Sequence, residues 1–190
     1  MTLIKRLFYF IIIMLFFIQC TNTNKYEVKK GMVGNINKKT TIADLSNIFK
    51  NDSIVSNKPL AETIDSQKIF SLNDDEYDIY SKSGKKLLEI TASKQNDSLS
   101  KIKSVGIYDP NYVTDKGISL KSTFKDINEN YLVNNIETTL TSATLFIDEL
   151  NATISIDKKE LGISEFSREQ VSLNQIPDMA KIKYFTIWFN

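Results

Sequence analysis

The two halves of the chain repeat one pattern of polar and apolar residues, and this repetition constrains the fold more than any other feature. In residues 36–49 and again in 118–131, a threonine or serine is a suitable helix N-cap and an acidic residue follows in the first turn. The apolar residues that recur at helical spacing are Ile42, Leu45, Ile48 and Phe49 in the first half and Phe124, Ile127 and Tyr131 in the second. Helices this short need a sheet to pack on.

Alternating residues after each helix predict strands. In the first half these are residues 68–72, 76–81, 85–92 and 102–108, and in the second half 143–148, 152–157 and 182–190. Residues 83–84 and 149–151 have the composition of hairpin turns. Residues 109–112 predict the turn between the halves, because Pro110 cannot continue a ladder of hydrogen bonds. Chance similarity between two short helix-and-strand units is the alternative to a true repeat.

The N-terminus has the features of a signal peptide. Lys5 and Arg6 precede the charge-free apolar run of residues 7–18, which is too short to cross a bilayer core of about 30 Å. The run ends at Cys20, the single cysteine. Together these residues resemble the lipobox of bacterial lipoproteins, although Gln19 stands where a small residue is usual. The resemblance implies cleavage before Cys20 and acylation of its thiol; an uncleaved anchor with an incidental cysteine is the alternative.

The residues after Cys20 bear on location. Thr21 is not the aspartate that retains some lipoproteins in the inner membrane, and the acidic cluster that resembles a surface-export signal in Bacteroidota is missing. We therefore expect a lipid-anchored protein of the cell envelope, on the periplasmic face of the outer membrane. The expected parts are a signal peptide (1–19), a lipidated cysteine with a flexible tether (20–29), and two repeats (30–112 and 113–190).

The repeat predicts an α+β fold of two tandem units, each with short helices packed on an antiparallel sheet, the two sheets joined as one continuous sheet. With its lipobox, this layout resembles the β-lactamase-inhibitor-protein fold and the SmpA/OmlA outer-membrane lipoproteins, and Bacteroidota is the expected source. The resemblance covers residues 30–190, and Gly31-Met32-Val33-Gly34 is similar to the Gly-Met entry to the first helix of those proteins. The following residues depart from that pattern, so no functional residue carries over. The resemblance implies a binding or scaffolding lipoprotein.

Composition argues against several function classes. Loss of Lys5 and Arg6 with the leader leaves 22 of the 24 Lys and Arg residues against 23 Asp and Glu, which disfavours a nucleic-acid partner. Histidine is absent, and no Gly-rich phosphate loop is present. Residues 73–78 are acidic enough to suggest calcium, but a solvated turn is the preferred interpretation because the glycine and distant glutamate of a calcium loop are missing. We expect no enzyme activity, no catalytic residues, no metal and no cofactor.

The strands at the end of each half suggest a site. If Val105, Ile107, Phe185 and Ile187 face the core, the opposite face carries Tyr108, Tyr184, Thr186 and Trp188. Large amphipathic rings among small polar residues are typical of a protein-recognition surface. The alternative is that these rings form a second core layer or lie under residues 159–177.

Three functions remain open at this point. The first is a non-catalytic lipoprotein that binds another envelope protein, as inhibitor, immunity factor or assembly subunit. The second is a periplasmic lipoprotein that binds a small or lipidic ligand, and the third is a hydrolase with an unrecognised site. Asp52-Ser53-Ile54 and Asp97-Ser98-Leu99 also resemble the O-glycosylation triplet of Bacteroidota.

Overall fold

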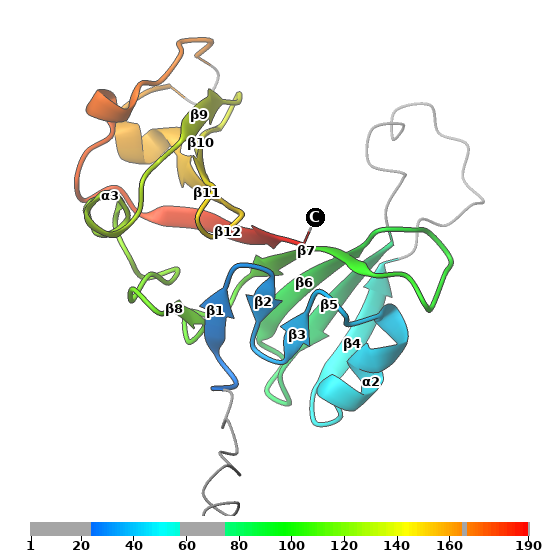
Figure 1. Cartoon of the computed structure of the whole chain (residues 1–190). Coiled ribbons are helices and arrows are strands. Elements are labelled where there is room, and N and C mark those ends of the chain that lie inside the picture. Colours follow the sequence, from blue (N-terminus) through cyan, green and yellow to red (C-terminus); the bar gives the residue numbers. More distant parts are fainter. Residues whose placement is uncertain (1–23, 58–74, 165–166, 190) are drawn as a thin grey trace, which may run out of the picture.

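The computed structural model describes residues 24–57, 75–164 and 167–189, and these residues form a mostly β fold. An eight-stranded antiparallel sheet has the order β4-β5-β6-β7-β12-β11-β10-β9 (Figure 1). Its strands are β4 (Ser53–Asn57), β5 (Glu76–Tyr80), β6 (Lys86–Ala92), β7 (Ile102–Ile107), β9 (Asn135–Thr138), β10 (Ser142–Ile147), β11 (Ala152–Asp157) and β12 (Ile182–Trp188).

A second, smaller sheet has the order β3-β2-β1-β8. Its strands are β1 (Glu27–Lys29), β2 (Met32–Val33), β3 (Ile36–Asn37) and β8 (Val113–Thr114). β1 pairs in parallel with β8, so the start of the described chain is joined to the point where the second half begins. β1 occupies the end of the range 20–29 that was expected to be a tether, and Val28 is fully buried.

The prediction of an α+β fold with tandem helix-on-sheet units is wrong. Among the described residues, the helices are α2 (Leu45–Ile48) and α3 (Phe124–Asn130), with short 3-10 turns η1 (Ile42–Asp44), η2 (Lys158–Leu161) and η3 (Leu173–Gln175). α2 has four residues and α3 seven, too few to form a layer over a sheet of eight strands. Val28, Val33 and Ile36 of the small sheet supply much of the cover instead. Strands of two or three residues are too short to show alternation, so the sequence pattern could not reveal them.

The two halves nevertheless enter the large sheet through matching contacts. Thr41 forms an isolated antiparallel β-bridge with Lys101, and Thr123 forms the equivalent bridge with Lys181. Ile42 and Ala43 donate main-chain hydrogen bonds to residues 100 and 98, and Phe124 and Lys125 do so to residues 180 and 178. A capping box begins both segments, with Asp44 accepting from the Thr41 N–H (2.8 Å) and Asp126 from the Thr123 N–H (2.7 Å). Strands β4–β7 form one four-stranded meander and β9–β12 form a second. The capped segment of each half makes equivalent contacts with its own meander.

One continuous core lies between the large sheet and its cover. The residues predicted to face the core from β7 and β12 are buried, namely Val105, Ile107, Phe185 and Ile187. Leu88 and Ile90 of β6 and Ile154 and Ile156 of β11 are buried beside them. Hairpin turns lie where they were predicted: Gly84, with φ of 79°, turns β5 into β6, and Asn151, with φ of 50°, turns β10 into β11. The expected strand at residues 68–72 lies outside the described residues. Within the described part of the chain, no helix has the length and apolar character needed to cross a membrane.

Candidate functional site

The large sheet has one face toward the core and one face, here called the open face, that points the other way. Across it, Asp78 lies opposite Glu89, Gly106 opposite Thr186, and Thr153 opposite Phe146. Side chains on the open face include Asp78, Lys86, Glu89, Ser104, Tyr108, Tyr184, Thr186, Trp188, Thr153, Ser155, Thr144 and Phe146. Most of these side chains are partly exposed, whereas those of the opposite face are buried.

The structure places the four predicted site residues on this one face. Phe185 pairs with Ile107, so Tyr184 lies across the β7–β12 seam from Tyr108, the residue directly after β7. Tyr184 and Trp188 are four residues apart on β12, roughly 13 Å at about 3.3 Å per residue. Tyr184 is 48% exposed, and the other three residues are partly buried. The face thus presents two neighbouring tyrosines and, farther along β12, a tryptophan.

Tyr108 is held in place by a polar cluster on β5 and β6. Its hydroxyl donates to Glu89 Oε2 (3.0 Å), and the Lys86 ammonium lies 4.2 Å from its ring centroid. Burial and then the Glu89 charge raise the pKa of Tyr108. The ring is therefore a fixed, un-ionised contact at neutral pH.

Lys86 links two carboxylates in this cluster. Its ammonium lies 2.8 Å from Asp78 Oδ1 and 2.7 Å from Glu89 Oε2. Burial alone would raise the pKa of Asp78, but the adjacent Lys86 ammonium and a hydrogen bond from Asn57 hold it below its usual value. Burial acts to lower the pKa of Lys86, yet its two carboxylate partners raise it overall. The cluster is thus an ionic network in which Asp78 Oδ2 accepts from Asn57 and Tyr80, while the buried Oδ1 has the Lys86 charge beside it but accepts no hydrogen bond.

The prediction of a solvated turn at residues 73–78 is wrong for the part of it that is described. Glu76–Tyr80 forms β5, with Asp78 buried in the cluster, and Asp75 is buried with its Oδ2 accepting from the Asn96 N–H (2.6 Å). Residues 73 and 74 lie outside the described residues. Among the described residues, no three His, Cys, Asp or Glu side chains gather as metal ligands would.

Trp188 closes one side of a hollow at the end of the open face. Its indole N–H donates to Thr153 Oγ1 (3.1 Å), and the Asn151 side-chain amide donates to the Trp188 carbonyl (2.9 Å). The hollow has a volume of about 220 Å³. Its lining is Phe146, Ile147, Asp148, Asn151, Ala152, Thr153 and Trp188. Two aromatic rings therefore border an open space on the same face as the tyrosines.

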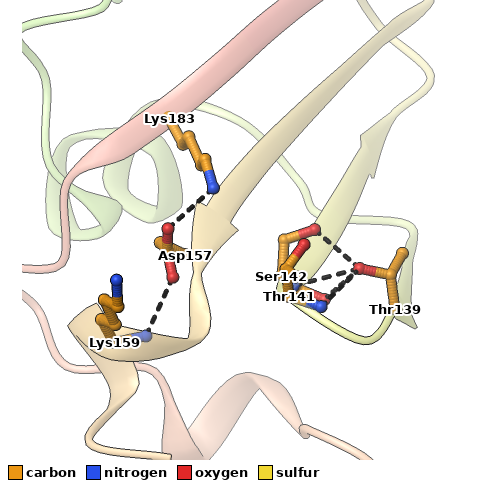
Figure 2. Close-up of polar contacts among 6 residues, drawn as sticks. All are labelled: Thr139, Thr141, Ser142, Asp157, Lys159 and Lys183. Carbon is orange, nitrogen blue, oxygen red and sulfur yellow. Dashed lines mark hydrogen bonds and ion pairs between the residues drawn. The ribbon is translucent and has the colours of Figure 1, made fainter. Parts of the chain in front are cut away.

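The start of β12, next to Tyr184, is fixed by an ion pair that Figure 2 shows. Lys183 Nζ lies 2.8 Å from Asp157 Oδ2, and the other Asp157 oxygen accepts from the Lys159 N–H (3.1 Å). In the nearby β9–β10 turn, Thr139 Oγ1 accepts from the main-chain N–H of Ser142 (3.0 Å). These contacts fix the strand ends at this border of the face.

Residues 159–177 were the alternative cover for the aromatic rings, and their described part packs on the core side. Val171 and Ile176 are buried in the core cluster. The Val171 N–H donates to Thr138 Oγ1 (2.9 Å) at the edge strand β9. Tyr184 remains about half exposed, which does not fit a second core layer.

Sequence analysis missed several residues of the open face. Asp78, Lys86, Glu89 and Phe146 were each placed in a predicted strand, but none was assigned to the site. Pairing β5 with β6 and β10 with β11 by hairpin register would have placed Asp78 beside Glu89 and Phe146 beside Thr153. The serines of both glycosylation-like triplets, Ser53 and Ser98, are exposed.

Comparison with known proteins identifies a fold neighbour and no family. No protein-family model matches this chain, and no curated protein matches it. The crystal structure of the uncharacterized protein yfeY from Escherichia coli is similar, with a TM-score of 0.53 and 10% sequence identity. The match covers 87% of this chain and 99% of that one. This likeness concerns the fold alone, and the resemblance to β-lactamase-inhibitor proteins and SmpA/OmlA lipoproteins stays a prediction.

Proposed function

We propose that this chain is a non-catalytic envelope lipoprotein whose open face binds another envelope protein. The observation that carries the proposal is Tyr184, a large ring on an inner strand of the sheet that is nevertheless 48% exposed. Tyr108, Thr186 and Trp188 lie around it on the same face. Tyrosine and tryptophan anchors surrounded by small polar groups favour protein recognition.

The state of the polar groups on the face supports binding over catalysis. Lys86 has a raised pKa and contacts two carboxylates, so its amine stays protonated and is not a nucleophile at neutral pH. Packing in the core also supports this function over storage of a lipidic ligand between the sheet and its cover. Leu88, Val105 and Ile154 have no exposed area there.

The proposed anchor is a lipid on Cys20, with the folded part on the periplasmic side of the outer membrane. The described chain begins just beyond this cysteine, and β1 follows within a few residues. Several acyl chains would hold such a protein durably at the membrane. An anchored domain meets its partner within a thin layer, which raises the effective concentration of both.

Site-specific photocrosslinking in intact cells tests the function. A photoreactive amino acid replaces Tyr184 in the full-length protein, and a second strain carries it at Met179. Met179 is 71% exposed but lies outside the open face, so it controls for accidental collisions. We expect a discrete adduct of defined mass from position 184 and none from 179. No adduct at 184, or the same adducts from both positions, would contradict the proposal.

A further inference from the structure

The two meanders have equivalent positions on the open face. A shift in strand register occurs in each meander, and the two shifts align these positions. The register shifts between Thr91 and Ala92 in β6, and between Ser155 and Ile156 in β11. Two residues before each shift lie Glu89 and Thr153. Since Glu89 pairs with Asp78 and Thr153 with Phe146, the Asp78–Glu89 pair matches the Phe146–Thr153 pair.

The aromatic residues that follow also match. Tyr108 and Trp188 lie six residues after the first residue of β7 and β12, respectively. Each ring makes one polar bond to the matched residue of the neighbouring meander strand: Tyr108 to Glu89 (3.0 Å) and Trp188 to Thr153 (3.1 Å). Both rings are therefore held at one edge by equivalent hydrogen bonds.

What lies beside the two rings differs. Next to Tyr108 is the Lys86 ammonium, 4.2 Å from the ring centroid. Next to Trp188 is the hollow of about 220 Å³. The pairing of β5 with β6 shifts register next to Lys86 and skips Leu87, so Lys86 lies on the same face as Glu89. β10 and β11 pair without such a shift, and no lysine stands at the matched position.

The hollow has the groups that a cation would use. Faces of tryptophan and phenylalanine attract cations, and a carboxylate adds charge. Asp148 is exposed, and none of the described residues forms an ion pair with its carboxylate. The Lys30 ammonium donates a hydrogen bond to the main-chain oxygen of Asp148 (3.1 Å). Its positive charge is near the hollow and partly opposes the binding of a second cation. The hollow has one carboxylate, that of Asp148, whereas Lys86 contacts two, those of Asp78 and Glu89. A cation in the hollow should therefore bind more weakly than Lys86 does and should exchange.

We infer that the hollow beside Trp188 receives an arginine or lysine side chain of the partner protein, in the position that Lys86 fills in the other half. This inference rests on the proposed function and specifies the chemistry of the partner. Phe146 and Trp188 provide the aromatic walls, and Asp148 provides the counter-charge.

Fluorescence of the full-length, lipid-anchored protein in detergent tests the inference, because Trp188 is the single tryptophan of the chain. The probe is N-acetyl-arginine amide, and its neutral control is the citrulline analogue of the same shape. We expect a saturable change in emission with the arginine compound only. Asp148→Asn should weaken the apparent affinity about threefold. Glu149→Gln, which removes a neighbouring carboxylate that pairs with Lys116 (2.6 Å), should leave it unchanged.

Three outcomes would overturn the inference: equal responses to arginine and citrulline, an unchanged affinity in Asp148→Asn, or tighter binding of choline, which would assign the hollow to a lipid headgroup. This titration needs no partner, unlike crosslinking from position 184. A crosslinked adduct from position 184 without a change in Trp188 emission on adding the arginine compound contradicts the inference but not the proposed function. An arginine response without an adduct contradicts the proposed function and reassigns the hollow to a small free cation.

Discussion

Lys86 shows how single residues shape the open face. Its ammonium compensates the buried Asp78, contacts Glu89, and lies over Tyr108, so three side chains depend on it for their positions. Because Asp78 is almost fully buried, its charge is tolerated only with these partners. Trp188 depends on a neutral partner, Thr153, and borders open space. The two ends of the face therefore differ in charge and in rigidity.

Replacement of Lys86 by Met should lower the free energy of unfolding by about 1–3 kcal/mol at neutral pH, because Asp78 stays buried without its charge partner. The pKa of Asp78 is below its ordinary 3.8 in the wild type, so this stabilisation is present above pH 3.8 and is lost as the pH falls through the lower, folded-state pKa. The difference between variant and wild type should therefore shrink in acid.

Urea unfolding at about pH 7 and at about pH 3 measures this difference. Lys82→Met is the control, since Lys82 is exposed in the neighbouring turn. A deficit for Lys86→Met that is equal at both pH values would show that the Asp78 pair does not contribute as described.

At the scale of elements, the β7–β12 seam joins the two meanders. Phe185 pairs with Ile107 and Ile187 with Val105, and all four side chains are buried. Tyr108 and Tyr184 of the open face lie directly across this seam, so the strand pairing sets the spacing of their rings.

Ile107→Ala and Phe185→Ala should each destabilise the protein by ~2–5 kcal/mol, because each leaves a cavity at the seam. Lys103→Ala, at an exposed position of the same strand, should cost well under ~1 kcal/mol. Urea midpoints compare the three. Similar midpoints for all of them would mean that the register of β7 against the core is wrong.

Elements with five or more alternating residues could be predicted from the sequence, as β6, β7 and β12 show. The small sheet could not, because β2, β3 and β8 have two residues each and their pairing depends on distant parts of the chain. The helical signal at residues 42–49 was real but short: η1 and α2 together end at Ile48, where Phe49 leaves helical geometry. That is why helices were expected to cover the sheet and strands cover much of it instead.

At the scale of the whole molecule, a single sheet of eight strands separates two environments. One side is covered by the small sheet, short helices and loops (Figure 1). The other side carries the tyrosines, Trp188 and the ionic network. Sequence alternation predicted Tyr108, Tyr184, Thr186 and Trp188 on this side. The Lys86 cluster and the hollow could not be predicted in the same way, since both depend on the cross-strand register and on its shift next to Lys86.

The proposed anchor is tested by Cys20→Ser in the full-length protein. Only the thiol can take the diacylglycerol, so the variant should lose both lipid labelling and cleavage before residue 20. Incorporation of labelled palmitate at the wild-type level would contradict the lipoprotein assignment. Ser98→Ala, at an exposed hydroxyl of the folded part, should label normally.

The binding role of the open face is tested by comparing binding with stability in Tyr184→Ala and Trp188→Ala. Partner captured from native membranes and the melting curve are measured on the same preparations. A binding face predicts a loss of ~2 kcal/mol or more in affinity, roughly thirtyfold, with a small change in melting temperature, most clearly for the half-exposed Tyr184. A large fall in melting temperature with unchanged affinity of the remaining folded protein would contradict the account.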